Sequence, residues 1–177
     1  MNFFRVCSML FLISILTQTS TAHSIEEVRK KFQLAIESST LTNTLSSELN
    51  KVSNPDPVLL AYIASLEALK AKHSWSPISK LQYMEAHKKV MNDAVRKSPN
   101  NLEIRYLRFN IQYSVPSYLG YSSNLEEDKK FIIQAFLNKK FDTTNKKLIQ
   151  EVYNLMVQTK SVSAEEKLKM EKVLRSL

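Results

Sequence analysis

The stretch from Asn101 to Tyr113 constrains the fold more than any other part of the chain. Placed on a helix at 100° per residue, its large side chains form two apolar faces, each about 60° wide, on opposite sides. One face consists of Leu102, Tyr106, Phe109 and Tyr113, and the other of Ile104, Leu107 and Ile111. A helix with two apolar faces normally packs between neighbours, so we expect it to be the middle layer of a helical stack.

The rest of the chain is predicted to be helical as well. It contains one glycine in 177 residues and no Asn-Gly or Asp-Gly pair of the kind that marks a β-hairpin. Helix-start signals recur along it, either as a capping residue followed by glutamate or proline, or as a capping residue alone. They stand at Ser24, Asp56, Ser76, Asn124, Asp142 or Thr143, and Ser163. Together with the apolar spacing, they predict an all-α stack of antiparallel helical hairpins with about eight helices.

The N-terminus has the pattern of a secretory signal peptide. Arg5 is followed by an apolar run over residues 6–16 and then by small residues at Ser20 and Ala22. The alternative, a membrane anchor, needs about 20 apolar residues, and this run is much shorter. We therefore expect a signal peptide over residues 1–22 and a single α-helical domain over residues 23–177, exported to the periplasm or secreted, with no transmembrane segment in the mature chain.

Cysteine usage and charge restrict the classes of function. The only cysteine, Cys7, precedes the expected cleavage site, which excludes disulfides, Cys-ligated zinc and cysteine nucleophiles in the mature chain. The formal net charge is +8, and residues 57–122 hold nine basic side chains against four acidic ones. In an exported protein this positive charge favours an anionic surface or an acidic protein as partner. The alternative is that the charge only keeps the protein soluble. No nucleic-acid-binding module is recognisable, so nucleic acid is not an expected partner.

Residues 57–115 resemble a degenerate tetratricopeptide repeat. They contain a helix, a turn, a second helix with Ala94, and then Pro99 before a new helix, which is the spacing at the end of that repeat. The segments Lys-His-Ser-Trp, Leu-Glu-Ile-Arg-Tyr-Leu-Arg-Phe and Pro-Ser-Tyr-Leu-Gly-Tyr-Ser also look like an uncharacterised family of small exported bacterial proteins. The first resemblance implies a groove that takes peptide tails, lined by the first helix of each hairpin. The second implies no activity.

Two sets of side chains are candidates for binding. Arg105, Arg108 and Gln112 form a polar strip between the apolar faces, where two guanidinium groups suit a carboxylate or phosphate. The alternative is that these arginines pair with acids of neighbouring helices, such as Glu67, Asp93 or Glu126. The second set, an aromatic patch at one end of the stack, suits a partner helix or peptide, unless it only seals the core. It consists of Tyr113, Tyr118, Tyr121 and Trp75.

The sequence supports a metal site or a catalytic site less strongly than it supports the two candidate binding sets. Met84, His87 and Met91 fall on one helix face, a set of soft ligands suited to Cu(I), although the same pattern describes core methionines around a hydrogen-bonded histidine. No catalytic motif is present, and the paired carboxylates open helices, where capping explains them. We therefore expect no resident cofactor and no enzymatic activity.

The sequence thus favours a non-catalytic module that binds a protein or peptide. The alternative is a carrier that holds a small acidic or amphiphilic ligand in a pocket between helices. An open groove lined by Arg105 would favour the peptide, and an enclosed apolar cavity above about 300 Å³ would favour the ligand. If Arg105 and Arg108 are both occupied by buried salt bridges, each reading loses that anchor.

Overall fold

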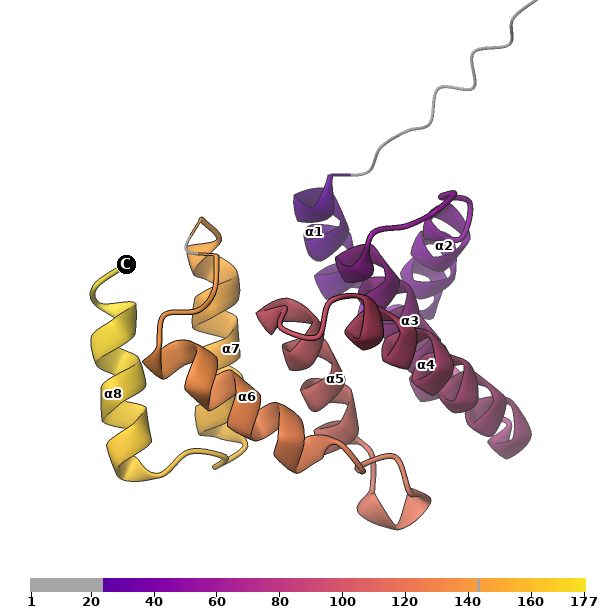
Figure 1. The fold of residues 1–177 in the computed structure, drawn as a ribbon. Helices are drawn as coiled ribbons and strands as arrows, with labels where there is room; N and C mark the ends of the chain where they lie inside the picture. The colour runs from indigo at the N-terminus through magenta and orange to yellow at the C-terminus, as the bar shows by residue number, and fades with distance from the viewer. Residues whose placement is uncertain (1–23, 143) are drawn as a thin grey trace, which may run out of the picture.

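The computed structural model describes residues 24–142 and 144–177, in which helices are the only regular secondary structure and no strand occurs. The all-α prediction is confirmed, and the predicted signal peptide lies outside the described residues. Eight α-helices and one short 3₁₀ helix follow one another along the chain (Figure 1). They are α1 (Ile25–Ala35), α2 (Ser39–Leu49), α3 (Pro57–His73), α4 (Pro77–Lys97), α5 (Leu102–Ser114), η1 (Ser117–Leu119), α6 (Leu125–Leu137), α7 (Lys146–Gln158) and α8 (Ala164–Leu174).

The helices begin where local capping chemistry favours it. The Asp56 carboxylate accepts hydrogen bonds from the backbone N–H groups of Val58 and Leu59 at 2.8 and 3.0 Å, and Pro57 opens α3. Ser163 forms a complete capping box at the start of α8. The predicted start of α7 at Asp142 or Thr143 is wrong for Asp142, which accepts from the Thr144 N–H in a turn, while Asn145 caps the helix. Thr143 lies outside the described residues.

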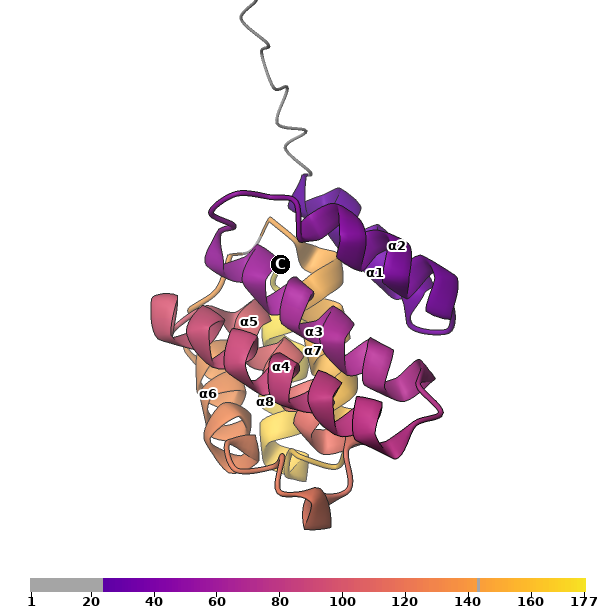
Figure 2. The same cartoon turned by 90° about the vertical axis from the view of Figure 1, so that its right-hand side faces the viewer.

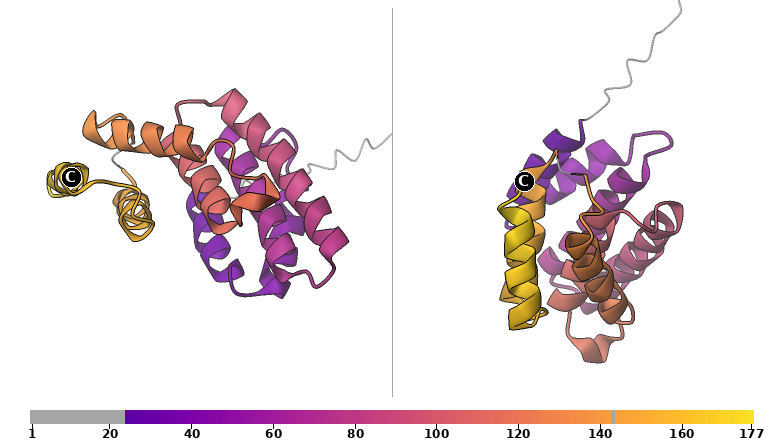
Figure 3. Two further views of the ribbon diagram at one scale, coloured as in Figure 1. Left: turned by 90° about the horizontal axis from the view of Figure 1, so that it is seen from below. Right: turned by 60° about the vertical axis from the view of Figure 1, so that its left-hand side comes forward.

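Consecutive helices pack as pairs, and the first helices of successive pairs also contact one another. Contacts join α1 to α2, α3 to α4, α5 to α6 and α7 to α8, and further contacts run from α1 to α3, from α3 to α5 and from α5 to α7. Figure 2 shows α3 and α4 side by side across the middle of the molecule, with α1 and α2 above them. Figure 3 shows α7 and α8 together on the side away from α1–α4.

Helix α5 joins the two halves of the stack, as its two apolar faces predicted. Ile104 and Leu107 belong to the core formed with α1, α2, α3 and α4. Leu102 and Phe109 belong to the core formed with α6, α7 and α8, and Tyr106 packs against both. Because the two faces enter different cores, α5 fixes the position of one half relative to the other. None of the helices in residues 24–142 and 144–177 combines the length and apolar character needed to cross a membrane.

Candidate functional site

The predicted binding strip on α5 is occupied by carboxylates of α6. Arg108 donates from Nε and Nη2 to the two carboxylate oxygens of Asp128, both at 2.6 Å. Arg105 donates from Nη1 to Asp128 at 2.8 Å and to Glu127 at 2.5 Å, and from Nε to the Pro99 carbonyl oxygen. The Asp128 side chain is completely buried, and the two arginine side chains are nearly so. The strip therefore holds α5 against α6.

The remaining polar group of the strip has the same role. The Gln112 amide oxygen accepts from the backbone N–H of Asn124, where α6 begins, at 3.1 Å. The partners of the arginines are Glu127 and Asp128, and not Glu67, Asp93 or Glu126, the acids expected from the sequence. Salt bridges to Arg105 hold the pKa of the Glu127 carboxyl below its ordinary value. With both guanidinium groups occupied, Arg105 and Arg108 no longer support a binding role for the strip.

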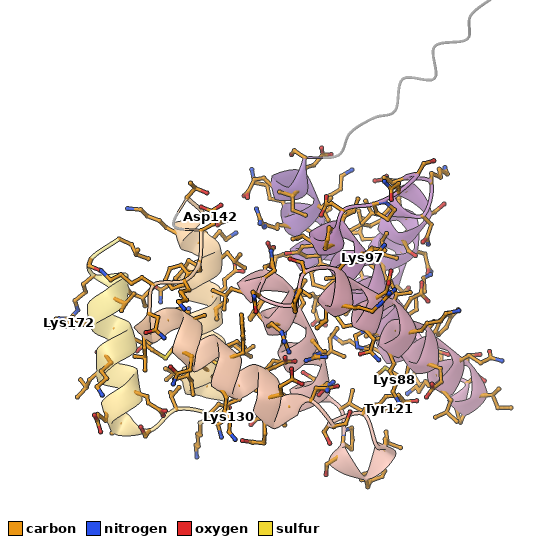
Figure 4. All side chains as sticks on the ribbon, viewed as in Figure 1. Lys88, Lys97, Tyr121, Lys130, Asp142 and Lys172 are labelled. Carbon is orange, nitrogen blue, oxygen red and sulfur yellow. The ribbon has the colours of Figure 1, made fainter. Side chains whose placement is uncertain are left out.

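The four aromatic residues of the predicted patch have different environments. Tyr121 is buried and its hydroxyl donates to Glu85 of α4 at 2.9 Å, so it fastens the loop after α5 (Figure 4). Tyr113 is half exposed and its hydroxyl donates to the Thr159 carbonyl oxygen after α7. Trp75 and Tyr118 are 97% and 85% exposed. Two of the four thus serve packing, and the two exposed ones lie in separate loops.

The Met84, His87 and Met91 side chains lie together on the buried face of α4. The His87 Nδ1 is 2.9 Å from the Ala64 carbonyl oxygen, and because a carbonyl only accepts, Nδ1 carries the proton. Burial lowers the pKa of His87, so the ring is favoured in its neutral form. No group of three or more His, Cys, Asp or Glu side chains suited to a metal occurs in the described part of the chain. Hydrogen bonding and packing account for the buried position of His87.

An apolar groove of about 720 Å³ lies between the described helices. It lies at the C-terminal ends of α1, α3 and α5, and is bordered by the first half of α4 and the loop that contains η1. Its apolar lining consists of Phe32, Ile36, Ala68, Leu69, Ala71, Leu81, Met84, Ile111, Val115, Pro116, Leu119 and Tyr121. Its polar lining consists of Ser65, Lys72, Lys80, Asn110 and Ser114. Of the residues predicted as binding residues, Tyr121 lines it.

Small residues on α3 and the loop after α5 create this space. Ser65, Ala68 and Ala71 recur every three residues on one side of α3 and leave room that larger side chains would fill. On the opposite wall, Val115 and Pro116 end α5 and the chain turns away through η1. Gly120 completes that turn with φ of +76°, the left-handed conformation expected for the only glycine.

The charged lining of the groove consists of two lysines. The Lys72 Nζ donates to the Glu37 carboxylate at 2.7 Å and to the Ile36 carbonyl oxygen at 2.9 Å. Lys80 is exposed and has no ion pair within residues 24–142 and 144–177. An apolar hollow with cations among its exposed lining residues is suited to a molecule that has an apolar body and an anionic end.

A second pocket, of about 260 Å³, lies near the N-terminal ends of α1, α3, α5 and α7. Arg29 and Glu103 line it and form a two-bond ion pair, with Nε and Nη2 at 2.7 and 2.6 Å from the carboxylate oxygens. The Tyr62 hydroxyl also donates to Glu103, at 2.8 Å. This network satisfies Glu103 from inside the protein, so the pocket offers a ligand fewer free polar groups than the groove.

Comparisons with known proteins add no family to this geometry. No protein-family model matches the chain, and no curated protein and no solved structure matches it. The resemblance to a tetratricopeptide repeat therefore stays a prediction.

Proposed function

We propose that this protein is an exported, non-catalytic carrier of an anionic amphiphile, whose apolar part enters the groove and whose head group meets Lys80. The apolar groove of about 720 Å³ is the observation that carries this proposal. Its volume falls within the roughly 300–1,000 Å³ typical of small-ligand sites. The carrier was the alternative in the sequence analysis. Both sequence-based candidates lose the Arg105 and Arg108 anchor, which is occupied, so the support for the carrier comes from the apolar lining of this groove.

Placing the head group at Lys80 follows from its surroundings. The ammonium of Lys72 already has the Glu37 carboxylate and the Ile36 carbonyl oxygen as partners, whereas Lys80 has no ion pair within the described ranges. An exposed ion pair contributes about 0.2–1 kcal/mol, so most of the affinity must come from apolar burial. Each buried methylene contributes about 0.8 kcal/mol, or about fourfold in Kd.

A peptide remains the second candidate for the same groove. The observation that favours it is that apolar side chains continue outside the hollow, with Ile78 71% exposed one turn before Leu81. An amphipathic helix laid into the groove would cover both. This reading predicts that unbranched fatty acids bind weakly and that their affinity does not grow steadily with chain length.

A chain-length series tests the carrier directly. Unbranched fatty acids from eight to sixteen carbons are titrated into the protein by calorimetry, below the concentration at which each forms micelles. We expect the Kd to fall about fourfold per methylene until the groove is filled. Ala68→Phe, which fills the groove, should abolish binding, while Ala164→Phe on exposed α8 should leave it unchanged.

The role of Lys80 is tested by comparing a fatty acid with the alcohol of the same length. Lys80→Ala should weaken a fatty acid about two- to fivefold and leave the alcohol of the same length unaffected, because only the acid carries a charge. Absence of binding at every chain length, or equal binding by the wild type and Ala68→Phe, would contradict the proposal.

A further inference from the structure

Exposed apolar side chains gather at the edge of the groove. Among the described residues, nine large hydrophobic side chains are exposed, and five of them lie in two segments beside the groove, residues 75–81 and 118–119. We call these five the docking rim: Trp75, Ile78, Leu81, Tyr118 and Leu119. Leu81 and Leu119 also line the groove itself, so the rim continues from its walls. This concentration beside one hollow marks an interaction surface.

The two aromatic residues of the rim lie in two different connections between helices. Trp75 lies in the turn between α3 and α4, and Tyr118 lies in η1 between α5 and α6 (Figures 1 and 2). At 97% and 85% exposure, neither side chain contributes appreciably to a core. Tryptophan and tyrosine are the residues enriched at membrane–water interfaces, because each combines an apolar ring with a polar group.

The charge around the rim favours an anionic surface. Residues 70–89 contain five lysines and one acid, Glu85, and residues 114–124 contain no charged residue. Nearby acids already have partners: Glu67 pairs with Lys70, Glu37 pairs with Lys72, and Glu85 accepts from Tyr121. Of the five lysines in residues 70–89, Lys80, Lys88 and Lys89 have no ion pair to another described residue.

We propose that the docking rim binds the surface of an anionic phospholipid bilayer, with Trp75 and Tyr118 at the headgroup level and the unpaired lysines against lipid phosphates. This inference rests on the proposed carrier function, because a rim that continues from the groove walls would let the amphiphile pass between bilayer and groove. A bilayer suits two separate apolar tips flanked by cations, since it presents a continuous apolar layer beneath anionic groups. A peptide partner would have to bridge the two loops.

The single tryptophan reports docking directly. The full chain is mixed with phosphatidylcholine vesicles containing either no phosphatidylglycerol or 30% of it, and Trp75 emission is recorded with and without brominated lipids. We expect a blue shift and quenching with the anionic vesicles alone, both of which are reduced by high salt. Unchanged emission with both vesicles would overturn the proposal, as would an equal response to both.

Matched variants locate the surface. Ile78→Glu should lower the partition coefficient into anionic vesicles by about tenfold, since it removes an apolar contact and adds a negative charge. Leu168→Glu makes the same change on exposed α8 and should leave partition unchanged. Residues 1–22 are identical in every variant, so differences report the rim. Equal loss in both variants, or in neither, would overturn the assignment.

The two proposals fail separately. Fatty-acid titration needs no vesicles, and vesicle binding needs no added fatty acid. Ala68→Phe, which fills the groove, should keep the Trp75 blue shift, whereas Ile78→Glu should keep fatty-acid binding. Loss of the Trp75 response in a folded Ala68→Phe variant would show that the rim does not act as a separate surface.

Discussion

Replacing Asp128 with asparagine tests the strongest electrostatic feature of the fold. The Asp128 carboxylate is fully buried and accepts three hydrogen bonds from two guanidinium groups, at 2.8, 2.6 and 2.6 Å. Asparagine has nearly the same size but no charge, and one of its two terminal groups cannot accept. Arg108 loses more than Arg105, because both of its short hydrogen bonds go to Asp128 and the next carboxylate, that of Glu127, is 3.6 Å away. Arg105 keeps Glu127 and the Pro99 carbonyl oxygen.

The size of the effect follows from burial. Leaving one member of a buried ion pair without its partner costs about 3–5 kcal/mol. A domain of this size has a free energy of unfolding of about 5–15 kcal/mol, so the change removes a large fraction of it. With a urea m-value of about 2 kcal/mol per molar, the midpoint should fall by about 2 M.

Urea denaturation followed by circular dichroism measures the shift. Asp93→Asn is the matched control, because Asp93 pairs with Arg96 and Lys97 at the surface of α4, and its midpoint should stay within error of the wild type. A midpoint for Asp128→Asn equal to that of Asp93→Asn would refute the view that the α5 strip fastens α6.

Three further predictions concern stability. Glu103→Gln should lower the free energy of unfolding by about 2–4 kcal/mol in urea titrations, since it uncouples Arg29 and Tyr62 from their shared carboxylate; an unchanged midpoint would contradict this. Gly120→Ala should cost about 1 kcal/mol by the same measurement, because φ is +76° there, although the space around it is open. Burial holds the pKa of His87 below its ordinary value, so between that value and the lower folded pKa the unfolded chain binds a proton that the folded chain does not. Stability should therefore fall as the pH drops from 7 towards 5, and His87→Asn should reduce that slope; equal slopes would contradict the assignment.

Local chemistry explains why the helices and the role of α5 were predictable. Asp56-Pro57 and Ser163 with Glu166 act within a single turn, so the sequence contains all the information needed to place those helix starts. The two faces of α5 are equally local, because the helical period alone puts Ile104 and Phe109 on opposite sides. The predicted helix start at Asp142 failed because other capping chemistry lies within the same few residues. Asp142 accepts from the Thr144 N–H in a turn, and Asn145 caps α7 instead.

The partners of the arginines depend on how helices cross and are not encoded locally. Glu127 and Asp128 occupy the first turn of α6, where acids are favoured by the helix dipole alone. Only the packing of α6 against α5 turns Asp128 inward towards Arg105 and Arg108. The polar strip was correctly identified as a feature of the sequence, but its partner lies within the same chain.

The groove likewise depends on tertiary structure, because four separate segments of the chain, residues 32–36, 65–72, 80–84 and 110–121, form its walls. One signal was present: Ser65, Ala68 and Ala71 place small side chains at three-residue intervals on a helix that is otherwise rich in large apolar residues. Such a series indicates either close helix packing or open space, and only the position of α5 and η1 decides between them. Lys80 and Leu119 were not predicted as binding residues, because their place in the groove also depends on how the helices pack.

Methionine-methyl NMR tests the central claim most directly. The helical domain contains four methionines, of which Met84 lines the groove, while Met91, Met156 and Met170 are buried elsewhere. Met91 lies on the same helix and serves as the internal reference. On titration with dodecanoate, we expect the Met84 methyl signal to move progressively while the other three stay in place. A stationary Met84 signal, or larger shifts at Met156 or Met170, would contradict a ligand in the groove.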